Sequence, residues 1–375
     1  MSRLLLLTIC LGLFALGGVG GGDTYASASN LQGKIAYIGT DGNIWLVNPD
    51  GSQLQQLTND AFEQHEKSES GMNTVYVRYD YFNGFWQRPK WSPDGTKLAY
   101  FRSHGRSGPD VANQSTVEFF VTNLIIPTEK IHSLSSTSGM QIVPTAWSAD
   151  SSGIYFEECG DPTYGLTSGC EIKLVSIDTS EVSTVFTVDE GWGATIINPS
   201  PDGKYIAWHK GKIEGVGVPC IFDLETQANY CSDLFRGRSS WSPDSSKLVI
   251  DNCGYGCAEG HMEIFDPADF SSVPLIQTSE KVSRFDPVWS PAGDKIAYME
   301  SISESDFGPT IESGLWVINP DGSGATKIAG SPSGYVYTFS PNGSYIVYAK
   351  RTEDTTEWGD FEIWVTKVDE ATPGR

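Results

Sequence analysis

Basic residues are scarce in this chain of 375 residues, where 25 Lys and Arg face 47 Asp and Glu and the formal net charge is −22. A surface with so much negative charge repels nucleic-acid phosphates and anionic lipid headgroups. We therefore expect no nucleic-acid partner. Charged residues of both signs make up only 19% of the chain, whereas aromatic residues reach 12%. So aromatic a composition is typical of a folded globule rather than a disordered chain.

Long apolar runs are absent except at the N-terminus, where residues 4–19 are mostly apolar and follow Arg3. The run is short for a membrane span, and the small residues Ala26-Ser27-Ala28 behind it suit a signal peptidase. We predict a signal peptide over residues 1–28 and a single domain over residues 29–375. The protein is then periplasmic or secreted, without membrane insertion after cleavage; an uncleaved anchor is the alternative.

Cysteine is also infrequent, with seven residues, of which six remain after the predicted cleavage. An even number in an exported chain favours disulfides over free thiols. Spacing alone leaves the pairing open, but the six fall into three pairs of near neighbours in sequence. We predict three local bridges, Cys159–Cys170, Cys220–Cys231 and Cys253–Cys257.

An internal repeat organises the rest of the chain. A phrase typified by Trp91-Ser-Pro-Asp-Gly95 recurs at intervals of 42 to 56 residues, and each copy precedes a short apolar strand. Pro fixes the backbone of a tight turn, Asp bonds to following N–H groups, and Gly takes the left-handed position, so the phrase is a turn and not a site. The six copies begin at Trp91, Trp147, Pro199, Trp241, Trp289 and Phe339.

Each repeat contains apolar strands that read as buried on both faces. A single sheet of this kind leaves both apolar faces exposed to water, and packing several sheets side by side in a closed ring buries them. We predict an all-β fold, a β-propeller of four-stranded antiparallel blades, with seven blades and six as the alternative. The Trp or Phe that opens each phrase should wedge between neighbouring sheets, and residues 28–32 should supply an edge strand that closes the ring.

The repeat resembles that of the TolB-type, WD40-like (PD40 repeat) propeller family, in which a Trp-Ser-Pro-Asp-Gly turn marks each blade. The resemblance covers residues 33–368 and implies the fold and a scaffold that binds a partner, while its motif says almost nothing about activity. The chain departs from the pattern at Ala149, Pro199 and Ala292, and its first unit lacks the phrase.

Connections after the second and fourth strands of each unit are long and irregular, whereas those after the first and third are short. Variable loops on a rigid scaffold commonly carry binding groups, so we predict that this long-loop face binds the partner. The largest insertion, 59–88, is rich in aromatics around Asn83-Gly84, which suits a hairpin turn. It is either an aromatic platform or a hairpin packed over the ring. The long loops are 59–88, 102–116, 157–170, 209–218, 251–261, 299–313 and 349–360.

Aromatic, histidine, arginine and acidic side chains in these loops are the candidate binding residues. Loop carboxylates suit Ca²⁺ or a basic partner, or only keep the protein soluble. We predict no catalytic residue and no cofactor, and leave Ca²⁺ open. The candidates are Tyr79, Tyr81, Phe82, Phe85, Trp86, His104, Arg106, Asp161, Tyr164, His209, Tyr255, His261, Asp306, Glu353 and Trp358.

A metal site is the weaker interpretation. Asp251, His104, His209 and His261 are the candidate ligands, because these residue types bind zinc and related ions. Seven-bladed oligogalacturonate lyases share the repeat and hold a divalent metal with histidines, so the resemblance also implies a metal-assisted polysaccharide lyase or glycoside hydrolase as the alternative function. No Gly-x-Ser-x-Gly nucleophile motif is present in the sequence.

Taken together, these features predict an exported, non-enzymatic, monomeric propeller. Its long-loop face is expected to bind a protein or a glycan.

Overall fold

A computed structural model describes most of the chain. The described residues are 11–12, 34–39, 41–48, 52–67, 70–79, 89–108, 111–123, 129–136, 141–159, 169–188, 193–211, 218–231, 238–252, 260–276, 280–303, 310–330, 337–340, 342–351 and 360–368. Of these residues, none belongs to a helix long and apolar enough to cross a membrane.

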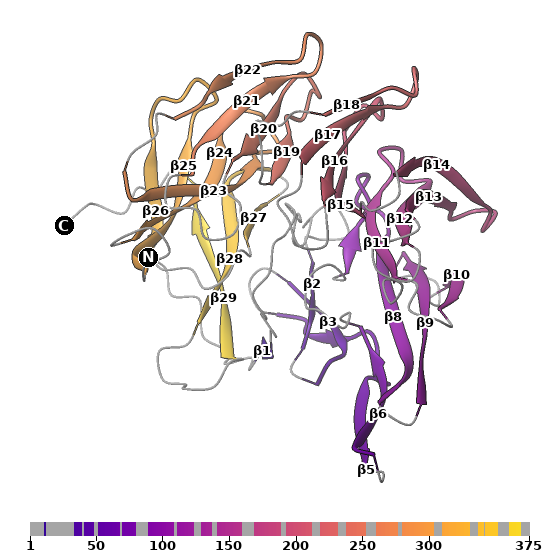
Figure 1. The fold of residues 1–375 in the computed structure, drawn as a ribbon. Coiled ribbons are helices and arrows are strands. Elements are labelled where there is room, and N and C mark those ends of the chain that lie inside the picture. Colours follow the sequence, from indigo (N-terminus) through magenta and orange to yellow (C-terminus); the bar gives the residue numbers. More distant parts are fainter. Residues whose placement is uncertain are drawn as a thin grey trace.

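The fold is all-β, a propeller of seven antiparallel blades, as the repeat predicted (Figure 1). Blades one and two differ from the others, with three and six described strands. Blade one contains β2 (Ile35–Ile38), β3 (Ile44–Val47) and β4 (Gln55–Gln56). Blade two contains β5 (Phe62–Lys67), β6 (Met72–Arg78), β7 (Lys90–Trp91), β8 (Leu98–Gly108), β9 (Val111–Thr122) and β10 (Glu129–Ser136).

The other five blades each have four strands in the described part of the chain. Blades three and four contain β11 (Gln141–Trp147), β12 (Gly153–Cys159), β13 (Cys170–Ser176) and β14 (Val182–Val188), then β15 (Gly193–Pro199), β16 (Tyr205–Gly211), β17 (Val218–Asp223) and β18 (Asn229–Cys231). Blades five and six contain β19 (Ser239–Trp241), β20 (Leu248–Asp251), β21 (Met262–Asp266) and β22 (Ser271–Pro274), then β23 (Val282–Trp289), β24 (Ile296–Ser303), β25 (Thr310–Ile318) and β26 (Thr326–Gly330). Blade seven contains β27 (Tyr337–Phe339), β28 (Tyr345–Arg351), β29 (Asp360–Lys367) and β1 (Leu11–Gly12).

The outer edge of blade seven is paired by a segment near the N-terminus. Leu11 of β1 lies opposite Phe361 of β29. Strand β1 falls within residues 1–28, the segment predicted to be removed. Residues 28–32, which we expected to form the edge strand, lie outside the described residues. An open edge strand offers unpaired N–H and C=O groups to any extended segment within reach, which accounts for the pairing.

Apolar side chains fill the space between blades. The residue seven positions after the start of each phrase is the first or second residue of the strand that follows the turn, and it is at most 1% exposed, as in Leu98, Ile154 and Ile296. Clusters of buried residues connect every neighbouring pair of blades; the last joins Ile35 and Val47 of blade one to Val347 of blade seven. Burial between blades therefore closes the ring.

The opening tryptophans of the phrase lie between blades, as predicted. The indole N–H of Trp147 in blade three donates to the carbonyl oxygen of Lys90 in blade two, at 2.9 Å. Trp241 in blade five makes the equivalent bond, also 2.9 Å, to Asn198 in blade four. Both rings are buried, so each adds a directional contact to an apolar interface.

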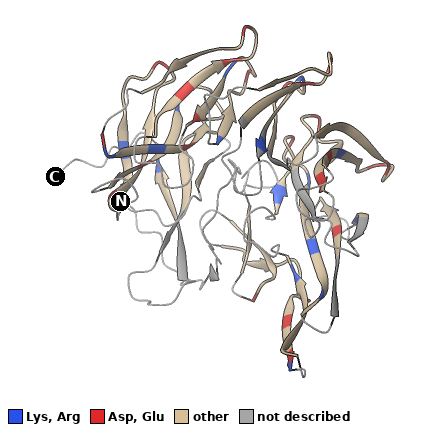
Figure 2. Cartoon of the chain, in the orientation of Figure 1, with Lys and Arg blue, Asp and Glu red and all other residues tan. Residues whose placement is uncertain are grey.

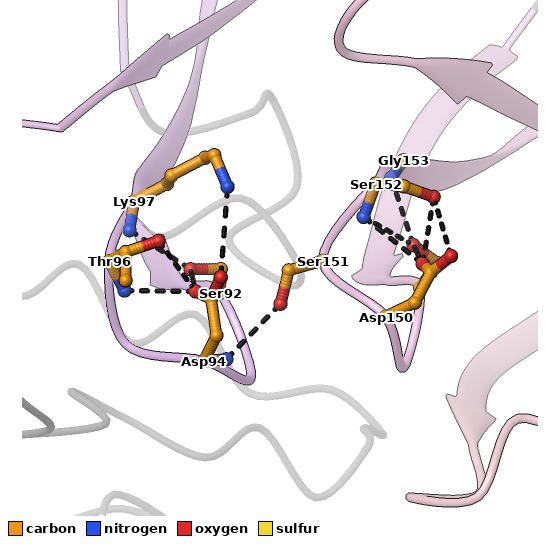
Figure 3. Close-up of polar contacts among 9 residues, drawn as sticks. Ser92, Asp94, Thr96, Lys97, Asp150, Ser151, Ser152 and Gly153 are labelled. Carbon is orange, nitrogen blue, oxygen red and sulfur yellow. Dashed lines mark hydrogen bonds and ion pairs between the residues drawn. The ribbon is translucent and has the colours of Figure 1, made fainter.

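The phrase itself forms a tight turn with one recurring bond (Figure 3). Ser92 donates from its hydroxyl to the Asp94 carboxylate at 2.6 Å, and the Thr96 N–H donates to the same carboxylate oxygen at 2.9 Å. Burial alone would raise the pKa of Asp94, but these hydrogen bonds lower it to about 2. Figure 3 shows the same contact between Asp150 and its neighbours in blade three.

Blade six keeps this bond although Ala292 replaces the aspartate. Ser290 donates instead to Asp294, two residues further along the turn, at 2.9 Å. The carboxylate has changed position, but it still accepts from the serine hydroxyl. The substitution therefore leaves the turn intact.

Two of these turns are also bonded to the preceding blade. Ser151 in blade three and Ser245 in blade five hold the left-handed position, with φ of 60° and 61°, where other copies have Gly. The Asp94 N–H donates to the Ser151 hydroxyl at 3.1 Å, and the Asp202 N–H to the Ser245 hydroxyl at 2.9 Å. The short-turn face is thus held together by contacts from blade to blade (Figure 3).

Two of the predicted disulfides are confirmed. Cys159–Cys170 joins β12 to β13, and Cys220–Cys231 joins β17 to β18. In both, the cysteines lie directly opposite each other in neighbouring strands. The third prediction, Cys253–Cys257, lies outside the described residues.

Candidate functional site

The most prominent feature of the long-loop face is an extension of blade two. Strands β8 and β9 are 11 and 12 residues long, and the hairpin of β5 and β6 adds to the far end of β8, where Thr74 lies opposite Ser107. Figure 1 shows these strands projecting beyond the other blades. We call residues 62–67, 72–78, 103–108 and 111–116 the blade-two arm.

The arm differs from the aromatic hairpin expected around Asn83-Gly84. Its hairpin turns between Lys67 and Met72, and the Asn83-Gly84 pair lies outside the described residues. The hairpin expected at Asn83-Gly84 therefore stays a prediction, while β6 pairs with the extended end of β8, a long-range contact with no local sequence signal. Tyr79, predicted as part of an aromatic platform, is only 5% exposed; its hydroxyl donates to Asp60, and its ring centroid lies 5.8 Å from that of Tyr100.

Charged side chains cross the base of the arm in a continuous series. Arg102 on β8 contacts Glu118 on β9 at 2.7 Å and Asp60 at 2.9 Å, while Lys130 on β10 contacts Glu118 at 3.1 Å. Burial raises the pKa of Glu118, but hydrogen bonds from Arg102 and Lys130 outweigh it and bring the pKa below its ordinary value. Glu118 is therefore ionised at neutral pH, and its contacts order the base of the arm.

The distal part of the arm carries further pairs of opposite charge. Arg106 contacts Glu66 at 3.0 Å and is 54% exposed, and Arg78 contacts Glu63. The Arg78 guanidinium also lies 4.8 Å from the centroid of the Tyr76 ring, a cation–π distance. Although the whole chain is strongly acidic, this surface displays both signs (Figure 2).

Strand β5 forms the outer edge of the arm. Within the described part of the chain it pairs only with β6. Almost all of its side chains are exposed, and Phe62 retains 47% of its surface. A six-residue edge of this kind can pair with an extended segment of another chain.

The candidate histidines have local carboxylate partners. His104 lies 3.7 Å from Glu118, and His261 lies 3.1 Å from Glu263 and 2.6 Å from the side-chain nitrogen of Asn252. The side chain of His209 lies outside the described residues. His104 and His261 thus each belong to a network within their own blade.

Among the described residues, one group of three His, Cys, Asp or Glu side chains has its ligand atoms within 4.8 Å of one another: Glu157, Cys159 and Cys170. Both sulfurs of this group are joined in a disulfide, which removes the thiolates a metal would need. Neither His104 nor His261 is brought together with two further ligands in the part of the chain that is described.

Asp251, the remaining metal candidate, belongs to a buried group that the sequence did not reveal. Its two carboxylate oxygens accept from the N–H groups of Arg238, at 3.0 Å, and Asp286, at 2.7 Å. The Arg238 guanidinium contacts Asp286 at 2.5 Å, and the Tyr337 hydroxyl donates to the Asp286 carbonyl. We call Arg238, Asp251, Asp286 and Tyr337 the buried acid–arginine cluster.

This cluster joins the inner edges of blades five, six and seven. Burial, reinforced by the Asp286 carboxylate, raises the pKa of Asp251 to about 8. Burial also raises the pKa of Asp286, to about 6, against the lowering effect of Arg238. The guanidinium contacts Asp286, whereas Asp251 is fully buried and accepts from backbone N–H groups, so Asp251 is largely protonated at neutral pH. Two aspartates beside buried apolar residues, Asp251 after Ile250 and Asp286 after Phe285, were the sequence signals that could have indicated the cluster.

The other candidate binding residues are not brought together by the described part of the structure. Arg106 lies on the arm, as described above. Those outside the described residues are Tyr81, Phe82, Phe85, Trp86, Asp161, Tyr164, Tyr255, Asp306, Glu353 and Trp358.

No family model matches the sequence, and no curated protein matches it. Solved structures do resemble the fold. Oligogalacturonate lyase from Vibrio parahaemolyticus superposes with a TM-score of 0.62 at 13% identity, covering 93% of this chain and 90% of the lyase. An oligogalacturonate lyase in complex with manganese gives 0.56 at 14% identity, with coverages of 84% and 83%.

The neighbours also include TolB from Acinetobacter baumannii, with a TM-score of 0.47 at 16% identity, covering 83% of this chain and 80% of TolB. At such identities, likeness of structure establishes the fold and leaves activity open. The chain is accordingly similar in fold, over most of its length, to oligogalacturonate lyases.

Proposed function

We propose that this protein is an exported, non-enzymatic propeller of the TolB type that binds a protein partner through its long-loop face. The open edge of β5 on the blade-two arm is the observation that carries the proposal. Export is inferred from the N-terminal apolar run and the Ala-Ser-Ala segment behind it, and the TolB type from the repeated turn phrase.

The arm suits a protein partner for two reasons. First, β5 offers main-chain groups along an exposed edge, to which an extended segment can add as a further strand. Second, the neighbouring side chains supply both charges and an exposed ring, in Arg106, Glu66 and Phe62. A mixture of an apolar anchor and paired charges is common at protein interfaces.

The proposal is tested by capture from an extract of the compartment to which the protein is exported. A double variant, Phe62→Ser with Arg106→Glu, alters the arm without touching the core. The matched control, Val365→Ser, removes a side chain that is 43% exposed on blade seven. We expect a partner that binds the wild type and the control, and binds the arm variant at least about tenfold more weakly.

Equal capture by all three proteins would refute the role of the arm. Binding of polysaccharide in place of protein, unchanged in the arm variant, would assign the face to a glycan. Thermal unfolding of each variant is the folding control: unchanged unfolding temperatures would exclude misfolding as the cause of a difference in capture.

A metal-assisted polysaccharide lyase is the second candidate function. What favours it is the likeness in fold to the oligogalacturonate lyase in complex with manganese. Metal analysis of the purified protein and a screen on uronate-containing polysaccharides separate the two candidates. Stoichiometric metal together with product formation would replace the binding proposal by this one.

A further inference from the structure

A cavity of about 500 Å³ lies between blades four and five, on the outer side of the ring. Trp208, Ile221 and Tyr230 line it from blade four, and Leu248, Phe265 and Phe270 from blade five. None of its described lining residues is acidic or basic. The volume falls within the range of ordinary ligand pockets. This cavity is separate from the long-loop face discussed above.

Two aromatic residues from different blades form its rim. Tyr230 and Phe270 are 41% and 39% exposed, and their ring centroids are 4.0 Å apart. Both rings also line the cavity. Its rim therefore presents an exposed aromatic surface, a feature typical of binding sites.

Phe270 occupies a backbone position that disfavours it. Its φ is 59°, in the left-handed region that bulky side chains rarely adopt. The corresponding turns of blades three and four end in Ser180 and Gln227, with φ of 59° and 58°. In all three turns the backbone N–H of this left-handed residue donates to the carbonyl oxygen of the residue four positions earlier, at 2.8 to 3.0 Å. Blade five thus departs from the repeat by placing an aromatic ring at the rim. Unfavourable backbone conformations of this kind cluster at functional sites.

The walls of the cavity indicate the chemistry of its occupant. Leu248 and Ile250 at its base are at most 3% exposed and apolar. The polar side chains of its wall are few: Ser239, Ser272 and Asn229, whose side-chain oxygen already accepts from Trp208. A sugar ring would therefore replace few of its hydrogen bonds to water there. An aromatic or large aliphatic side chain would bury its surface at no such cost.

The surrounding charge indicates the rest of the partner. The turn between β21 and β22 carries Asp266 and Asp269, and the turn between β17 and β18 carries Asp223 and Glu225. Figure 2 shows acidic residues at the tips of both hairpins. Hydrogen bonds from Ser271 lower the pKa of Asp269, and that from the Thr226 N–H lowers the pKa of Asp223, so both are negative at neutral pH. A second copy of this chain, also strongly acidic, would be repelled.

We propose that the cavity between blades four and five binds an aromatic side chain of a basic protein segment. The ring packs against the exposed surface of the Tyr230–Phe270 pair at the rim, and flanking Lys or Arg residues face the acidic hairpin tips.

The test uses the peptide acetyl-Lys-(5-fluoro-Trp)-Lys-amide, titrated with the full chain and followed by fluorine NMR. We expect binding to the wild type that weakens as salt rises. Phe270→Gly removes the rim aromatic at a position whose φ suits Gly, so the protein should remain folded while binding weakens at least about tenfold. Ser180→Gly makes the same backbone change in blade three and should leave binding unchanged.

Exchanging the two lysines of the peptide for glutamates should also weaken binding. The proposal is overturned if the wild type does not bind the lysine peptide, or if Phe270→Gly binds it as well as the wild type. A wild-type dimer in sedimentation that Phe270→Gly dissociates would assign the cavity to a second copy and likewise overturn it. Thermal unfolding of both glycine variants serves as the folding control.

Discussion

At the scale of single residues, the left-handed serine of the turn phrase shows how one side chain serves two purposes. Ser151 is 3% exposed, adopts a φ of 60°, and accepts the Asp94 N–H of the neighbouring blade. Gly would relieve the conformational cost but lose the acceptor, whereas Ala would keep the cost and lose the acceptor.

We therefore expect Ser151→Ala to reduce the free energy of unfolding by about 1–3 kcal/mol, the cost of a buried donor left without its partner together with the left-handed backbone. Ser151→Gly should cost less. Urea unfolding of the two variants and the wild type measures the difference. If Ser151→Ala proves as stable as the wild type, the bond between blades contributes nothing.

The buried acid–arginine cluster leads to a prediction about pH. Both carboxyls have a higher pKa in the folded protein, about 8 for Asp251 and about 6 for Asp286, than the ordinary 3.8. Their contribution to stability is therefore complete below about pH 4 and is lost as the pH rises through 6 and then 8, by at most about 1.4 kcal/mol per pH unit for each proton.

Asp286→Asn tests this prediction, because Asn tolerates the φ of 58° at this position and can still accept from Arg238. We expect the free energy of unfolding to depend less steeply on pH between about 4 and 6 in this variant than in the wild type, because in that range Asp286 keeps its proton in the folded state and loses it in the unfolded state. The exposed substitution Asp178→Asn should retain the wild-type slope. Parallel slopes for all three proteins, in urea unfolding at several pH values, would contradict the assignment.

At the scale of strands, the two disulfides offer a matched comparison, since each joins neighbouring strands across a separation of 11 residues. Removing either, as Cys159→Ala with Cys170→Ala or as Cys220→Ala with Cys231→Ala, should lower the free energy of unfolding by about 2–3 kcal/mol. The local effects should differ. Only the second pair should speed hydrogen exchange over β18, which carries Tyr230 of the cavity rim. Equal exchange in both variants would show that the bridge does not hold β18.

Some strands could be predicted from the sequence and others could not. The strands after each turn phrase were predictable, because turn chemistry and apolar runs are local properties. The arm was not, because β6 pairs with residues 103–107 of β8 across the intervening chain. The buried acid–arginine cluster was missed for a similar reason: its members come from three blades, and only the ring brings them together.

At the scale of the whole molecule, β1 lies within the segment predicted to be cleaved, and this yields a test of export. Mass spectrometry of the protein recovered from the exported fraction should give an N-terminus at Ser29. Recovery of a chain that retains Leu11 and Gly12 would contradict cleavage and would support β1 as a permanent edge of blade seven.

The relocated carboxylate of blade six has a wider consequence for how such rings diverge. The Ser290 hydroxyl donates to Asp294 at 2.9 Å and the Ser92 hydroxyl to Asp94 at 2.6 Å, so a carboxylate at either of two positions in the turn can accept this bond. A turn that carried an acid at both positions would keep this bond when either acid was replaced. The sequence of the phrase can therefore differ from one blade to the next while the turn, and with it the blade, is kept.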